Sequence, residues 1–289
     1  MVQQPARPDN CRAPGSLLES FSFTAECRPR KMPASRRELV MHDALFNERL
    51  ARFAPVLTRR REGMDTVMPL RRLLEGNVLE GVLKRFSEHH GPSERRALAT
   101  QWSKHYLSQL IIPVTVIELC RDVHLPTNLD EMGVILAEDG TPERFVLPHE
   151  GTISLDNGCA RFCPLIARHL TPLIDTLARR VHFSPRVLWS NAAVYFEFAV
   201  NELDRQGLAS PFEINGARAM MALRQLPDRQ RNPFYRPVDY IDVADDDGAT
   251  EPWRCRRVCC LRYLDDALGL CGNCPRLKTT RADDQPAQA

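Results

Sequence analysis

Apolar residues recur three and four positions apart along most of the chain, which is the period of an amphipathic helix. The pattern begins near Ser35, which has the spacing of a capping box with Glu38 and leads an apolar face over residues 39–53. A second apolar face covers residues 70–86 and should stop at Gly91-Pro92. Residues 39–53 and 70–86 are therefore predicted to be helical.

Further helices are expected where a hydroxyl residue precedes a proline, because serine or threonine caps a helix and proline suits its first position. This dipeptide occurs at Thr171-Pro172, Ser184-Pro185 and Ser210-Pro211. Another helix should start at Ser93 and pass through Trp102 and Tyr106. Pro113 should kink or end that helix, since proline lacks the amide hydrogen that a helix interior needs.

The helical spacing of apolar residues is interrupted between residues 131 and 148. Two short apolar runs, 133–136 and 145–147, flank the turn-forming sequence at 138–142, which indicates a small hairpin. The expected fold class is mainly α with a small β hairpin or sheet (α+β), in which a helical body is followed by a small C-terminal cysteine-rich segment.

Composition divides the chain into parts. Residues 1–34 carry five prolines without sustained periodicity and are expected to form a disordered tail, in which Cys11 and Cys27 are incidental. The remaining parts are a helical body at 35–250, a cysteine-rich segment at 251–281 and a second disordered tail at 282–289.

Composition also limits the partners and the compartment. A formal net charge of only +2 argues against nucleic acid or an anionic membrane as an obligate partner. The amino terminus shows no apolar signal region, and the longest uncharged apolar stretch, Leu110 to Ile117, is too short to span a bilayer. Clustered thiols without an export signal fit a reducing compartment. We expect a cytoplasmic protein, at most peripheral to the inner membrane.

Four of the ten cysteines fall within sixteen positions: Cys259, Cys260, Cys271 and Cys274, here called the cysteine quartet. Thiolates suit a soft metal centre, and the two-residue gap of Cys271-Gly-Asn-Cys274 lets a turn aim both sulfurs at one ion. Structural zinc fits the adjacent pair poorly, because neighbouring side chains in extended backbone point to opposite sides. A disulfide and four free thiols are further alternatives.

A 2Fe-2S cluster takes two thiolates per iron, so it accommodates four cysteines. Cys271 and Cys274 could serve one iron, and Cys259 and Cys260 the other.

The motif Arg-Arg-Val-Cys259-Cys260-Leu-Arg-Tyr, followed ten residues on by Cys271-Gly-Asn-Cys274-Pro, resembles the cluster motif C-C-x10-C-x2-C of the FhuF-type siderophore-iron reductase family, whose members are 2Fe-2S ferric iron reductases. Less specific segments of that family are similar to residues 101–106, 188–193 and 232–234. The resemblance covers residues 36–278, and the first thirty-five residues have no counterpart.

This resemblance implies a ferric-siderophore reductase in which the cysteine quartet holds a 2Fe-2S cluster. One electron would pass to a cytoplasmic ferric siderophore, and Fe(II) would then be released, because hard siderophore oxygens hold Fe(II) far less tightly than Fe(III). No catalytic residue beyond the cluster is expected. The chain carries no recognisable nicotinamide or flavin motif, so a separate donor, a ferredoxin or a flavoprotein reductase, is expected to supply the electron. The alternative is a zinc- or cluster-stabilised module for siderophore binding or biosynthesis, without reductase activity.

Charge changes sign just before the cysteine quartet. The run from Asp239 to Glu251 has six acidic residues and no basic one, which predicts a solvated loop. Arg256, Arg257 and Arg262 then flank the adjacent cysteines, where they would stabilise an anionic cluster and attract an anionic ligand or an acidic electron donor. Lys104, in a segment similar to the family, completes the expected substrate-binding set, and its neighbour His105 could line the same cleft.

Other chemistry-bearing residues near the quartet are secondary candidates. Cys255 is a possible substitute ligand that the family pattern leaves out, and Trp253 is a candidate shield for the metal site. Cys159 and Cys163 have helical spacing and are expected to be small hydrophobic residues of the core.

Overall fold

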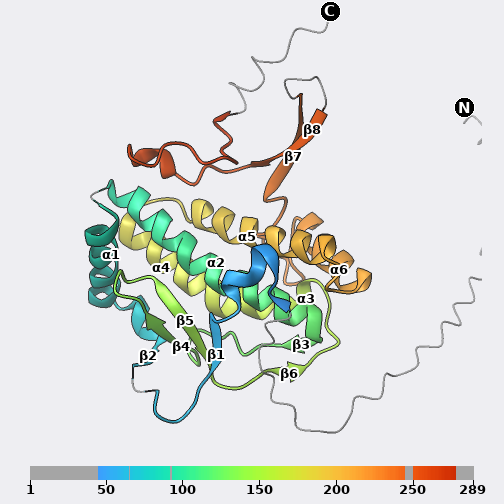
Figure 1. Ribbon diagram of the computed structural model, residues 1–289, viewed down its shortest axis with the longest axis horizontal. Coiled ribbons are helices and arrows are strands. Elements are labelled where there is room, and N and C mark those ends of the chain that lie inside the picture. Colours follow the sequence, from blue (N-terminus) through green and yellow to red (C-terminus); the bar gives the residue numbers. More distant parts are fainter. Residues whose placement is uncertain (1–44, 65, 92, 245–249, 278–289) are drawn as a thin grey trace, which may run out of the picture. The chain divides into compact units, whose positions relative to one another are not determined.

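Helices α2 (Arg95–Arg121) and α5 (Pro185–Arg205) pack against each other at the centre of the structure (Figure 1). Every residue from Leu110 to Leu119 of α2 is buried, as in a helix that other elements enclose. The computed structural model describes residues 45–277 apart from 65, 92 and 245–249. The tails expected at residues 1–34 and 282–289 lie outside the described residues.

Further helices contact this central pair: α1 and α4 pack on α2, and α4 and α6 pack on α5. Their bounds are α1 (Gly76–His90), α3 (Cys159–Leu165), α4 (Thr171–Val181) and α6 (Pro211–Ala222). Shorter helical segments are the 3-10 turns η2 (Glu48–Phe53), η3 (Leu70–Leu74) and η5 (Arg262–Leu264) and the π-helical η4 (Ile166–Leu170).

Two of the three predicted hydroxyl-proline helix starts are confirmed. The Ser184 hydroxyl accepts a hydrogen bond from the Arg186 amide at the start of α5, and the Ser210 hydroxyl accepts one from Glu213 at the start of α6. Thr171 does not cap a helix, because η4 runs directly into α4 and the threonine hydroxyl instead donates to the Ile166 carbonyl.

Four other predictions about helices are corrected. The Glu94 carboxylate, not Ser93, caps α2. Helix α2 does not end at Pro113, because this proline is buried among apolar neighbours whose packing outweighs the lost hydrogen bond. The described part of the helix expected at 35–53 is the short 3-10 turn η2. The helix expected over 70–86 is divided into η3 and α1 by extended backbone at Glu75, and it ends at Gly91 as predicted.

A four-stranded sheet with the order β1-β5-β4-β2 lies beside the helices, and its central hairpin β4–β5 is the predicted one. Strand β1 pairs with β5 in parallel, and β2 pairs with β4 in antiparallel fashion. Its strands are β1 (Leu57–Arg59), β2 (Met68–Pro69), β4 (Gly133–Leu136) and β5 (Pro142–Leu147). A smaller antiparallel pair joins β3 (Val123–His124) to β6 (Thr152–Ile153).

The acidic run is not a loop throughout, as the sequence suggested. Strand β7 (Val238–Ala244) pairs with β8 (Thr250–Arg256) in an antiparallel hairpin, from Val238 opposite Arg256 to Ala244 opposite Thr250. Apolar residues interspersed with the acids of β7 provide the side chains that a strand requires. The boundary expected after residue 250 falls within β8.

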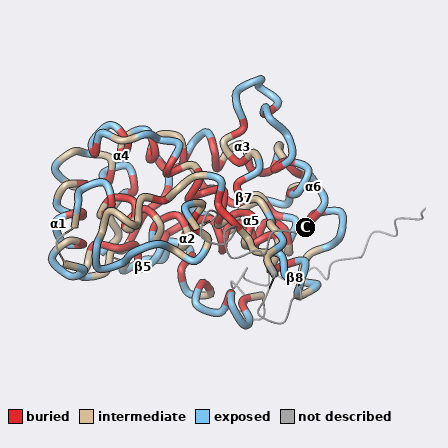
Figure 2. Tube along the Cα trace, turned by 90° about the horizontal axis from the view of Figure 1, so that it is seen from above, coloured by how far each residue is buried: buried red, intermediate tan, exposed pale blue. Residues whose placement is uncertain are grey.

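The hydrophobic core gathers around α2 and α5, where the trace in Figure 2 is mostly buried. Trp102, Tyr106 and Phe145 are among its largest fully buried side chains. Helices dominate and the sheets are small, so the predicted α+β class holds for the described residues.

Candidate functional site

The second half of the cysteine quartet is folded back onto strand β8. The Cys274 amide donates to the Cys271 carbonyl at 2.9 Å, which closes a turn over the two intervening residues. Trp253 donates its indole N–H to the Gly272 carbonyl at 3.0 Å, and the Arg256 amide donates to the Asn273 carbonyl at 2.9 Å. The turn that carries Cys271 and Cys274 is therefore held beside the strand that leads to Cys259 and Cys260.

The four thiols meet as two pairs. The Sγ atoms of Cys260 and Cys271 lie 3.8 Å apart, and the Cys259 thiol is hydrogen-bonded to Cys274. Each pair thus joins one member of the adjacent cysteines to one member of the C-x-x-C turn, which differs from the grouping that the sequence suggested. Cys260 and Cys274 are buried, and Cys259 and Cys271 are half-buried.

The sulfur separation matches the needs of a metal. Two thiolates on one tetrahedral ion, each about 2.3 Å from it, are about 3.8 Å apart. In the described part of the chain, however, no three His, Cys, Asp or Glu side chains converge closely enough to hold a metal ion together. The described thiols therefore offer two separate pairs of sulfur donors.

Positive charge surrounds the thiol pair of Cys260 and Cys271. The pKa of Cys260 falls to about 4, because of its hydrogen bond with Cys271 and because Lys104 and Arg256 lie close by. The same hydrogen bond raises the pKa of Cys271. Cys260 is consequently the member of the pair that favours the thiolate.

Arg256 links the quartet to the centre of the helical body. Its guanidinium is buried and donates to the Asn191 side chain and to the Ser190 hydroxyl of α5. Asn191 in turn donates to Ser103 of α2 at 3.3 Å. The Nε atom of Arg256 has no hydrogen-bond partner among the described residues.

A second anchor fixes the hairpin β7–β8 to α5. The buried carboxylate of Glu197 accepts two hydrogen bonds from the Arg254 guanidinium, one of them at 2.7 Å from Nε, and another from the Tyr240 hydroxyl. Asn201 also donates to Glu197 at 2.7 Å. One carboxylate therefore holds side chains from both strands of the hairpin.

A pocket of about 230 Å³ lies between the cysteine segment and the helices. Its cationic lining residues come from η2, α2 and β8, and α5 contributes Val194, Tyr195 and Phe198. Cys271 forms part of the wall. The complete lining is Arg52, Lys104, Ile112, Val194, Tyr195, Phe198, Arg254, Arg256, Cys271 and Asn273.

The structure separates the four basic residues that the sequence suggested for substrate binding. Lys104 and Arg256 line the pocket with Cys271. Arg257 is turned toward β7, where it donates to the Arg236 carbonyl and lies 3.8 Å from Asp239. Arg262 lies in η5, which packs on α2, and is not part of the pocket lining.

The substrate-binding set expected from the sequence left out two cations of the pocket, Arg52 and Arg254. Arg254 is two positions from Arg256 and so shares its face of strand β8, a signal that could have added it to that set. Arg52 comes from a segment about 200 residues earlier in the chain, and its sequence neighbourhood carries no signal. His105 is exposed and contacts the rings of Phe86 and His90 instead of the pocket.

Other candidates have local explanations. Cys255 is buried, and its thiol donates to the Arg256 carbonyl. By strand alternation, Cys255 lies on the opposite face of β8 from Arg254 and Arg256. Cys159 and Cys163 are half-buried and pack against the core, close to the role expected for them.

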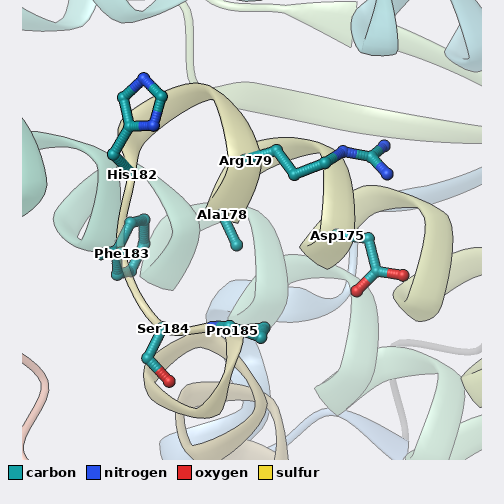
Figure 3. A pocket seen from close by; sticks show the side chains of 7 residues that line it. All are labelled: Asp175, Ala178, Arg179, His182, Phe183, Ser184 and Pro185. Carbon is teal, nitrogen blue, oxygen red and sulfur yellow. The ribbon is translucent and has the colours of Figure 1, made fainter.

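A larger hollow lies elsewhere, at the junction of α4 and α5. It measures about 780 Å³, and its lining includes Asp175, Arg179 and Ser184. In Figure 3 these side chains point in different directions and do not converge on a common position. The smaller pocket beside Cys271 is the better candidate, because positive charge, the Cys271 thiol and apolar walls meet there.

Comparisons with known proteins agree with the expected family. The family model described as "Ferric iron reductase FhuF-like transporter" matches residues 100–246, from helix α2 to the end of β7. This match ends before the cysteine quartet. The protein named "Ferric siderophore reductase" of Escherichia coli (strain K12) is 22% identical over 206 residues, which cover 68% of this chain and 75% of that protein. No described helix is long and apolar enough to cross a membrane. The chain belongs to the FhuF-like ferric iron reductase family.

Proposed function

We propose that this protein is a ferric-siderophore reductase, which binds a ferric siderophore and transfers one electron to its Fe(III). The siderophore then releases the iron, because its hard oxygen ligands hold Fe(II) much less tightly than Fe(III). Family membership supports the reaction class, and the name of the Escherichia coli relative supports the substrate class.

The cysteine quartet is proposed to hold a 2Fe-2S cluster, which supplies one-electron redox chemistry when bound. Such a cluster requires four thiolates, two for each iron. The two thiol pairs supply this number, one pair for each iron. We propose that Cys260 and Cys271 bind one iron and that Cys259 and Cys274 bind the other. The 3.8 Å contact between the first two sulfurs supports this assignment.

The surrounding residues have three tasks in this proposal. Lys104 and Arg256 offset the negative charge of the thiolates, since both already lower the pKa of Cys260. Arg254 and Arg256 hold strand β8 on α5 through Glu197 and Asn191, which fixes the quartet relative to the helices. The pocket wall formed by Cys271 brings a bound ligand next to one of the thiolates.

The electron is proposed to come from a separate donor, a ferredoxin or a flavoprotein reductase, in the cytoplasm. The sequence carries no fingerprint of a nicotinamide or flavin site, which is why we assign that role to a partner.

The observation that carries the proposal is the meeting of two thiol pairs and a cation-lined pocket in a chain of this family. Its test is the composition and visible spectrum of the anaerobically purified protein. We expect two irons and two inorganic sulfides per chain, with visible charge-transfer bands. A colourless protein with one bound zinc per chain would refute the cluster and favour a zinc-stabilised binding module. A coloured protein that binds ferric chelates without reducing them would refute the reductase activity.

A further inference from the structure

The lining of the pocket beside Cys271 is positively charged. Four of its lining residues are cationic and none is acidic. Glu197 neutralises Arg254, and the Cys260 sulfur lies near Lys104 and Arg256. Arg52 makes no ion pair within the described residues and is exposed, so its charge remains available to a ligand that arrives from solvent.

Two hydrogen-bond donors, one from Arg256 and one from Tyr195, supplement the positive charge of the pocket. The buried Nε of Arg256 has no partner among the described residues, which is unusual for a buried N–H group. Tyr195 also lines the pocket, and burial raises its pKa to about 12, so its phenol keeps the proton that it can donate. Apolar walls from Ile112 and Phe198 limit screening by water. Together these groups favour an oxygen anion.

The size of the pocket limits what can enter. At about 230 Å³ it is smaller than the roughly 300–1,000 Å³ that sites for drug-sized ligands usually measure. A hexadentate ferric chelate is at least as large as such ligands, so only an arm or an edge of the chelate fits, while the rest stays outside.

We propose that this pocket takes up an anionic oxygen group of the substrate and thereby selects ferric siderophores of net negative charge over neutral or cationic ones. The proposal rests on the proposed function for the identity of the ligand as a ferric chelate. The dependence of binding affinity on the charge of the chelate can be measured without any electron transfer.

The test uses three chelates with the same three hydroxamate groups: desferrioxamine B with its terminal ammonium, its neutral N-acetyl derivative and its anionic N-succinyl derivative. Loaded with redox-inert Ga(III), they report binding to the anaerobic holoprotein by isothermal titration calorimetry. We expect the anionic chelate to bind about tenfold more tightly than the cationic one, with a preference that shrinks as salt is added.

Arg52 provides the sharpest variant, because it is exposed and makes no ion pair within the described residues. Arg52→Gln should weaken binding of the anionic chelate about fivefold and leave the neutral chelate unchanged, whereas Arg52→Lys should keep the preference. Arg179→Gln removes the same charge from the hollow between α4 and α5, so it is the matched control and should change nothing.

The outcomes separate the two proposals. Equal affinity for the three Ga(III) chelates, or equal effects of Arg52→Gln and Arg179→Gln, would overturn selection by this pocket. If the Fe(III) chelates were nevertheless reduced by the reduced holoprotein, the proposed function would stand. A clear anionic preference that depends on Arg52, without reduction of any Fe(III) chelate, would support the pocket and overturn the reductase activity.

Discussion

Replacing Glu197 with glutamine should loosen the hairpin that leads to the cysteine quartet. The Glu197 carboxylate binds Arg254 of β8 through two hydrogen bonds and Tyr240 of β7 through a third. Glutamine keeps the shape but removes the charge and one acceptor oxygen. The Arg254 guanidinium would then be left without its counter-ion against α5.

The size of the effect follows from burial. The side chain of Glu197 is 6% exposed and that of Arg254 is 23% exposed, so water replaces the lost partner only in part. Breaking a fully buried ion pair costs about 3–5 kcal/mol, and hydrogen bonds to charged groups contribute about 1.5–3 kcal/mol. We take about 2–3 kcal/mol for this partly solvated pair, which multiplies the population of the detached hairpin about 30- to 150-fold.

Hydrogen-deuterium exchange with mass spectrometry measures this population. In Glu197→Gln, amides of the ladder between Val238 and Arg256 should exchange faster by about that factor, while those of α2 stay protected. Glu202→Gln is the matched control, since Glu202 is a buried glutamate of the same helix that pairs with Arg49 and Arg205 instead. Unchanged exchange in β7 and β8 of Glu197→Gln would refute the anchoring role.

Three further predictions concern the quartet and the core. Cys260→Ser should abolish the visible absorption of anaerobic protein, whereas Cys255→Ser should keep it, since Cys255 lies on the other face of β8; the reverse result would move the ligand assignment. Trp253→Phe removes the hydrogen bond to Gly272, worth about 1 kcal/mol, so the proposed cluster should bleach in air about fivefold faster, and an unchanged rate would contradict that role. Burial raises the pKa of Glu118 to about 8 from its ordinary value near 4.5, so the wild type should lose up to about 4 kcal/mol of stability as pH rises through this interval. Glu118→Gln should lack this loss in urea unfolding at about pH 5 and pH 8, and a pH-independent difference between the two proteins would refute it.

Local sequence signals predicted much of the helical body. The starts of α5 and α6 are visible in the sequence because a serine cap and a first-turn proline act within a few residues of each other. Thr171 carries the same signal but failed, since the preceding π-helical segment already supplies the helical backbone. At Pro113, packing around a buried helix outweighed a local preference that no neighbouring residue could reveal.

The candidate site could be predicted only in part, because some of its contacts depend on tertiary packing and not on local sequence. The quartet and its basic neighbours lie within one short segment, so their spacing marked them as candidate ligands and candidate charges. The pairing of Cys260 with Cys271 depends on how the C-x-x-C turn folds back on β8. The placement of Arg52 in the same pocket depends on tertiary packing over about 200 residues, which no pattern in the chain encodes locally.

The central claim is most directly tested by a single-turnover reaction without oxygen. Protein purified anaerobically is reduced with one electron equivalent, freed of reductant and mixed with a ferric siderophore in the presence of a coloured Fe(II) chelator. The account predicts that the visible bands of the oxidised protein return while one Fe(II) per chain appears at the same rate, and that Cys260→Ser yields none. Return of the bands without Fe(II), or Fe(II) formation that survives loss of the cysteine quartet, would contradict it.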